Sequence, residues 1–124
     1  MTPILLTYHI APAKLAKIQV LCLRLGIRVR AVPPEEYGVP LAVIAGLEDA
    51  GTHPVPEETF SDEMLVMANF RPGMMDAFLN GFRQSRIPPV PLKAMLTETN
   101  AQWNSVALHS AIAEEHEKMK NRKK

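Results

Sequence analysis

The one residue suited to covalent chemistry is Cys22, because the 124-residue chain contains a single cysteine. A reactive thiol needs an electropositive, accessible surrounding that lowers its pKa. Cys22 instead follows Leu15 and Ile18 at helical spacing, which places it on the apolar face of a predicted helix. We therefore expect a buried thiol that packs as a small hydrophobic side chain, and the sequence identifies no catalytic residue.

The histidines and carboxylates predict neither a metal site nor an acid–base pair. His109 and His116 are seven residues apart, about 10.5 Å along a helix axis, which is too far to chelate one ion. His53 lies in an acidic loop, where we expect a solvated side chain. Glu35 and Glu36 are adjacent and point in different directions, as in a solvated turn.

Motifs for common cofactors are absent from the sequence. It contains no glycine-rich phosphate loop, dinucleotide fingerprint, Cys-x-x-Cys or His-Glu-x-x-His. One cysteine cannot hold an ordinary iron–sulfur cluster. The sequence therefore predicts no cofactor.

His9 and Asn69 are the candidate residues for an anion site. Each follows a predicted strand and precedes a helix that begins near a proline, Pro12 or Pro72. Helix N-termini favour anions because their first amide groups are unpaired. Proline supplies no such amide and no glycine loop admits a ligand, so capping of the strand ends is the alternative.

The charges are unevenly distributed along the chain. The net charge is +1, but residues 31–70 contain eight acidic residues and no Lys or Arg. This acidic window carries −8, and the remainder, with 14 basic and five acidic residues, carries +9. We expect the acidic window to contact the basic remainder, within one molecule or between copies, and the alternative is that the two face separate partners. The eight acids are Glu35, Glu36, Glu48, Asp49, Glu57, Glu58, Asp62 and Glu63.

The elements that position these residues form two similar units. Residues 4–8 predict a buried strand, 12–25 an amphipathic helix ended by Gly26, and 27–32 a half-exposed strand. The same apolar pattern recurs 60 residues later, from Met64 onward. Two such units predict an α+β protein with a ferredoxin-like βαββαβ fold, a four-stranded antiparallel sheet with two helices on one face. The first and third strands contain no proline, whereas prolines close the second strand and lie at the start of the fourth, which predicts that the second and fourth strands form the edges.

The length of the chain predicts a single domain, residues 1–124. An apolar stretch at residues 40–47 predicts a short helix, and Thr99–Gln102 fits a capping box that begins a C-terminal helix. We expect this helix to dock on the body through an apolar side that includes Trp103. The predicted segments are the first half at 1–37, an acidic connector at 38–62, the second half at 63–97, the C-terminal helix at 98–120 and a basic tail at 121–124.

Three segments resemble a known family. They are RVRAVPPEEYG at 28–38, EMLVMANF at 63–70 and PLKAMLTETNAQW at 91–103. On these segments the chain resembles a bacterial family of domains of unknown function, numbered thirty-seven eighty-three. The resemblance implies a small bacterial cytoplasmic protein and carries over no catalytic residues. The loop at 52–60 departs from the family pattern.

The composition also bounds the function. Hydrophobic residues make up 47% and charged residues 22%, as in globular proteins. A single cysteine, no signal peptide and no apolar stretch of about 20 residues predict a cytoplasmic protein without a membrane span.

Three functions stay open, and the absence of a catalytic constellation favours the first. It is a non-enzymatic binding or protein-interaction module, which could self-associate into a homo-oligomer through a sheet edge or face. The alternative is a small-ligand sensor or enzyme whose site lies between the sheet and the acidic connector. The third is nucleic-acid binding through basic helix faces, which the lack of a stacking-aromatic signature on the strands disfavours.

Overall fold

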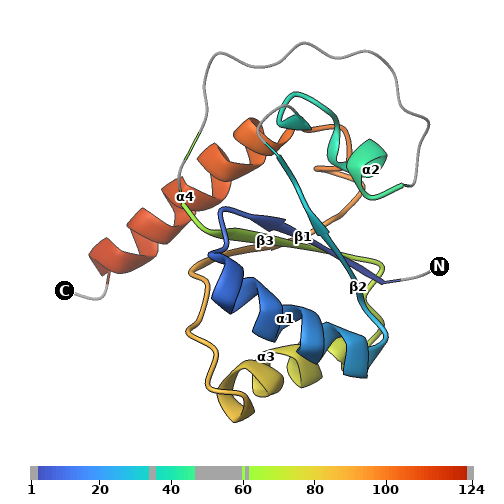
Figure 1. Ribbon diagram of the computed structural model, residues 1–124. Helices are drawn as coiled ribbons and strands as arrows, with labels where there is room; N and C mark the ends of the chain where they lie inside the picture. The colour runs from blue at the N-terminus through green and yellow to red at the C-terminus, as the bar shows by residue number, and fades with distance from the viewer. Residues whose placement is uncertain (1–2, 34–35, 47–59, 61, 123–124) are drawn as a thin grey trace.

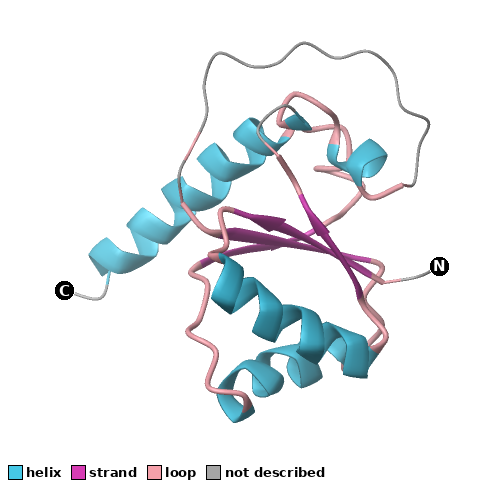
Figure 2. Ribbon diagram, in the orientation of Figure 1, coloured by secondary structure: helices cyan, strands magenta, loops and turns pink. Residues whose placement is uncertain are grey.

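The computed structural model describes residues 3–33, 36–46, 60 and 62–122 (Figure 1). Strands and helices alternate along most of the chain (Figure 2). The elements are β1 (Ile4–Tyr8), α1 (Pro12–Leu25), β2 (Arg28–Ala31), α2 (Leu41–Ile44), β3 (Met64–Ala68), α3 (Met74–Gln84), β4 (Leu92–Met95) and α4 (Ser105–Arg122).

The four strands form one mixed sheet in the order β2-β1-β3-β4. The central pair β1–β3 is antiparallel, but β1–β2 and β3–β4 are parallel. The α+β class and the central positions of β1 and β3 are as predicted, whereas the strictly antiparallel ferredoxin-like sheet is not. In that fold β2 would pair with β3, commonly through a hairpin. Here residues 32–63 separate the two strands, and each half closes as a local parallel βαβ unit.

Helices cover both faces of the sheet rather than one. Figure 1 shows α1 and α3 on one side and α2 and α4 on the other. Leu5 faces a core shared with α1 and α3, while Leu6 and Tyr8 face a second core shared with α2 and α4. The short helix expected at residues 40–47 is present as α2. Burial of both faces explains why every residue of β3 is apolar and buried.

The 60-residue repeat is visible in the geometry. We call two residues repeat mates when they are 60 positions apart and so match in the repeat. In the β1–β3 ladder Leu6 pairs with its repeat mate Val66, so a pseudo-two-fold axis passes between them. Both helices end in the same turn, in which Ile27 N–H donates to Cys22 and Ile87 N–H donates to Phe82. After this turn, the outer strand of the second half begins later in the repeat than that of the first half. Ile4 pairs with Arg28, whereas Met64 pairs with Leu92, four residues further along.

The helix α4 begins later than the predicted capping box. The side chain of Asn104 caps it by accepting a hydrogen bond from the Ala107 amide at 2.9 Å. A reciprocal box does exist two residues earlier, where Thr97 and Asn100 exchange side-chain to backbone hydrogen bonds. That box closes a single turn, with Ala101 N–H donating to Thr97 O.

Docking of α4 does not depend on the tryptophan. Leu108 is 2% exposed and, with Ile112, packs in the second core. Trp103 precedes the helix and is 38% exposed. The expectation that Trp103 is buried was therefore wrong, because the residue lies in the turn before α4 rather than on its apolar side.

Candidate functional site

The two candidate anion residues occupy equivalent positions in the repeat but are far apart in the sheet. His9 and Asn69 follow β1 and β3 with left-handed φ angles of 56° and 62°. Because β1 and β3 are antiparallel, these turns lie at opposite ends of the strands. The Nε2 atom of His9 is 2.8 Å from the Tyr37 hydroxyl. The structure thus does not bring the pair together into one anion site.

Aromatic side chains gather on the face of α2 and α4, beside the end of the acidic connector. Phe60 is sandwiched between Tyr37, with ring centroids 4.8 Å apart, and His109, with centroids 4.1 Å apart. The His109 Nε2 atom lies 2.9 Å from a carboxylate oxygen of Asp62. Sequence reasoning missed this cluster. Its signal was the two aromatic residues, Tyr37 and Phe60, that lie near the two ends of the acidic connector.

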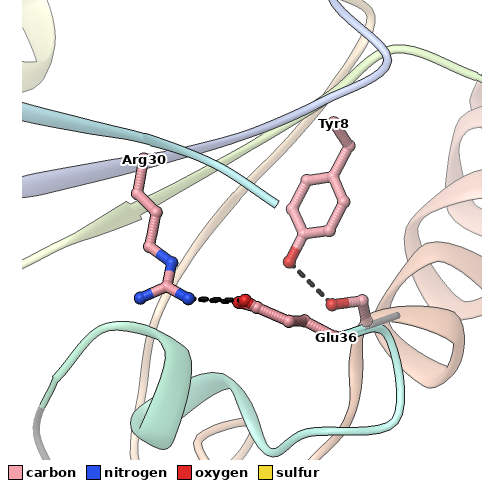
Figure 3. Close-up of polar contacts among 4 residues, drawn as sticks. Tyr8, Arg30 and Glu36 are labelled. Carbon is pink, nitrogen blue, oxygen red and sulfur yellow. Dashed lines mark hydrogen bonds and ion pairs between the residues drawn. The ribbon is translucent and has the colours of Figure 1, made fainter. Parts of the chain in front are cut away.

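Ser105, His109 and Asp62 are the residue types of a hydrolytic triad, but their bonding is different. The Ser105 hydroxyl lies 2.7 Å from the Tyr8 hydroxyl, a bond drawn in Figure 3. His109 contacts Asp62 and Phe60, and no hydrogen bond joins it to Ser105 in the described part of the chain. Burial raises the pKa of Tyr8, so its hydroxyl stays protonated. The arrangement holds α4 to β1 and lacks the serine–histidine contact that activates a nucleophile.

Cys22 is fully buried, as predicted. Desolvation raises the pKa of its thiol to about 12, so little thiolate forms at neutral pH. Among the described residues, no group of three metal-ligating side chains is found. No helix among them is long and apolar enough to cross a membrane.

The acidic window contacts the basic body in the same molecule. Of its eight acids, the structure describes Glu36, Asp62 and Glu63. Glu36 pairs with Arg30 (Figure 3), Asp62 with His109 at 2.9 Å, and Glu63 with Lys14 at 2.9 Å. Each described acid thus contacts a basic side chain. The other five acids and His53 lie outside the described residues.

The β2 strand leaves part of its backbone open. Arg28 N–H donates to Pro3 O and Val32 N–H donates to Thr7 O, both toward the strand β1 side. In a parallel ladder, alternate residues direct both backbone groups to the same neighbour. Val29 and Ala31 therefore direct theirs to the outer edge. Within the described part of the chain, no hydrogen bond satisfies these outward groups.

A pocket of about 330 Å³ lies beside this edge, between β2 and α2. Its walls are apolar on the side of β1 and α2 and carry two guanidinium groups on the side of β2. The lining residues are Ile4, Arg28, Val29, Arg30, Ile44, Ala45 and Gly46. The sequence signals for this region were the alternation of apolar and basic residues at 27–32, which indicated exposure, and the prolines after the strand, which predicted an edge.

The opposite edge, β4, is better protected. The side-chain amide of Asn100 donates to the outward backbone carbonyl of Met95 at 3.0 Å. Lys93 is half-buried, its ammonium group donates to Val90 O, and desolvation lowers the pKa of Lys93. Three prolines at 88, 89 and 91 precede the strand. Edge strands are commonly protected in these ways against pairing with other chains.

The fold and these surfaces define a three-layer α+β domain with a mixed sheet, one edge of which is open within the described residues. Residues 63–119, from the start of the second βαβ half into α4, match the family model described as Domain of unknown function (DUF3783). This match confirms, over these residues, the family resemblance predicted from the sequence. Neither a curated protein nor a solved structure matches the chain.

Proposed function

We propose that this protein is a non-enzymatic protein-interaction module that binds an extended segment of a partner along β2. The observation that carries the proposal is the pair of outward-facing residues, Val29 and Ala31, whose backbone groups have no hydrogen-bond partner among the residues that the structure describes. Addition of a strand to a sheet edge gains affinity from main-chain hydrogen bonds.

Self-association through the same edge is disfavoured by charge. Two copies of β2 would bring Arg28 and Arg30 of one molecule next to those of the other. Like charges placed opposite each other across a strand pair are destabilising. We therefore expect a different protein as the partner, and any homo-oligomer to use another surface.

The second candidate is a small-ligand sensor or enzyme with a site between the sheet and the connector. The observation that favours it is a groove of about 450 Å³ bordered by Asp62, His116 and Glu117 and continuous with the Asp62–His109 pair. Its ionisable groups are carboxylates and the imidazole of His116, without a nucleophile among the described lining residues. Nucleic-acid binding through the basic faces of α1 and α3 comes third, as a phosphate-directed interaction.

The edge-binding proposal is tested with a ten-residue peptide of alternating threonine and valine. N-methyl groups on every second residue leave one hydrogen-bonding edge, and a second peptide carries N-methyl groups on all residues. We expect only the first of these two peptides to bind. Its binding should slow amide hydrogen exchange at Val29 and Ala31.

The matched protein variants are Ala31→Pro and Ala31→Val. Proline removes an outward donor without touching the bonds to β1, which an edge strand tolerates. Loss of one hydrogen bond of about 1 kcal/mol weakens binding about fivefold, while the valine variant keeps its affinity. Equal binding of both peptides, or no binding of either, would contradict edge pairing.

A further inference from the structure

The pocket beside β2 combines one available positive charge with an apolar wall. Arg28 and Arg30 both line it, but their situations differ. The guanidinium of Arg30 is held by both carboxylate oxygens of Glu36 (Figure 3). No carboxylate among the described residues pairs with Arg28. Among the described residues, Arg28 is therefore the pocket arginine that is available to pair with a partner's carboxylate.

The apolar wall lies within reach of the same bound strand. Ile44 is 3% exposed and Ile4 is half-buried in the second core, and both border the pocket together with Ala45. Side chains of a strand alternate between the two faces of a sheet, so residues i and i+2 of a partner strand lie on one face. Two alternate partner residues would therefore face Arg28 and the pocket.

We propose that the partner segment contains an acidic residue and an aliphatic residue two positions apart. The carboxylate pairs with Arg28, and the aliphatic side chain enters the pocket against Ile4 and Ile44. This inference rests on the edge binding proposed above and names the chemistry that selects the segment. Directly opposite charges on neighbouring strands stabilise the pair, which fixes the register of the added strand.

Protection against aggregation and phosphate binding are two further roles for these arginines, and both fit the pocket less well. Arginines on an edge strand can simply prevent aggregation, but this role requires no apolar pocket beside them. A guanidinium also binds phosphate, yet a nucleic acid would use several phosphate contacts and would not fill an aliphatic pocket.

The experiment uses four peptides with N-methyl groups on alternate residues. One carries glutamate and isoleucine two positions apart, the second lysine and isoleucine, the third glutamate and threonine, and the fourth is the threonine–valine peptide. Binding is measured by the backbone amide shifts of Val29 and Ala31 in NMR titrations. We expect the glutamate–isoleucine peptide to bind about tenfold more tightly than the lysine–isoleucine peptide.

Three variants separate the contributions. Arg28→Glu is expected to reverse the preference toward the lysine peptide, and Ala45→Leu to remove the advantage of isoleucine over threonine. The matched control Arg83→Glu makes the same charge change on α3 and is expected to leave the preference unchanged. Reversal by Arg28→Glu and not by Arg83→Glu supports the proposal.

Failure of this inference is distinguishable from failure of the edge-binding proposal. If all four peptides bind equally and Ala31→Pro weakens them, the edge binds strands without the predicted selectivity, and the inference is wrong. If the glutamate peptide responds to Arg28→Glu but Ala31→Pro has no effect, the contact is ionic and strand addition is wrong. A short single-stranded DNA that competes at low salt with the glutamate peptide would also overturn the inference.

Discussion

The two βαβ halves of this protein share one plan and differ where the plan cannot be repeated. Each half has a buried strand, a left-handed turn at His9 or Asn69, a helix and an outer strand. The halves meet along the β1–β3 pair and through contact of α1 with α3. Differences between the halves therefore show which positions are constrained by the fold and which are free for another role.

The first difference lies where the two helices meet. Leu21 and Gly81 are repeat mates, and they contact each other: a Cβ atom built on Gly81 would lie 2.3 Å from a methyl group of Leu21. A residue and its repeat mate can touch only near the pseudo-two-fold axis. Space on that axis admits one large side chain, so the halves must differ there.

The second difference lies at the outer edges. The strand of the second half, β4, has Asn100, Lys93 and the preceding prolines to protect it. In the strand of the first half, β2, the outward groups of Val29 and Ala31 have no hydrogen-bond partner in the described part of the chain. This difference supports the proposal that the β2 edge binds a partner.

The largest expected effect comes from placing the same large side chain at both repeat mates beside the pseudo-two-fold axis. The variant Gly81→Leu places two leucines in a space that admits one, and overpacking of this kind costs about 3 kcal/mol or more. The free energy of unfolding, measured by urea titration with circular dichroism, should fall accordingly.

The control for this prediction is Gly81→Ala in two backgrounds. In the wild-type background the new Cβ meets Leu21, whereas in Leu21→Ala the space is free and alanine gains about 1 kcal/mol of helix propensity over glycine. A double-mutant cycle should therefore give a favourable coupling between the two alanines. Zero coupling would show that the helices do not meet as described.

Much of this comparison could be predicted from the sequence, because periodicity and proline placement are local signals. The apolar pattern of β1 and α1, its recurrence after 60 residues and the burial of Cys22 all followed from side-chain spacing. The strand order did not, because spacing within each half is the same whether β2 pairs with β1 or with β3. Only the long connection before β3 distinguishes the two arrangements.

The candidate site was less predictable for a related reason. His9 and Asn69 look equivalent in sequence, but the antiparallel β1–β3 pair sends them to opposite ends of the sheet. The cluster of Tyr37, Phe60 and His109 depends on the stacking of Phe60 on His109 of α4. These two residues are 49 positions apart in the sequence, and no local pattern encodes such a contact. The open edge of β2 likewise depends on which strand lies beside it.

The next prediction concerns repeat mates of different chemistry, Cys22 and Phe82. The pKa of the buried thiol is about 12, against 9.0 when unperturbed. The unfolded state therefore loses its proton first as the pH rises above 9, and stability falls through this window by about 1.4 kcal/mol per pH unit. At about pH 10.5 the loss is about 2 kcal/mol.

Urea titrations across this range would measure the loss. Tyr8 contributes to the decline at higher pH, because its pKa is also raised by burial. The variant Cys22→Ala removes the thiol contribution and should show a smaller decline between pH 9 and about pH 10.5. Identical declines in the two proteins would mean that the thiol is already ionised, and therefore accessible, in the folded state.

The smallest expected effect comes from the turns that end the two helices. Gly26 and Arg86 are repeat mates with left-handed φ angles of 74° and 56°. Glycine adopts this conformation without steric cost, whereas a side chain at such a position costs about 1–2 kcal/mol. Part of this gain is offset because glycine makes the unfolded chain more flexible, so Arg86→Gly should stabilise the protein by about 0.5–1 kcal/mol.

The matched control is Ser85→Gly one residue earlier, where φ is −89° and glycine should destabilise. Thermal unfolding followed by circular dichroism would separate the two variants by several degrees, about 4 °C per kcal/mol for a chain of this size. If Arg86→Gly lowers the midpoint as Ser85→Gly does, the side chain of Arg86 makes a stabilising contact that outweighs its backbone conformation, and the second half does not repeat the turn of the first at the energetic level.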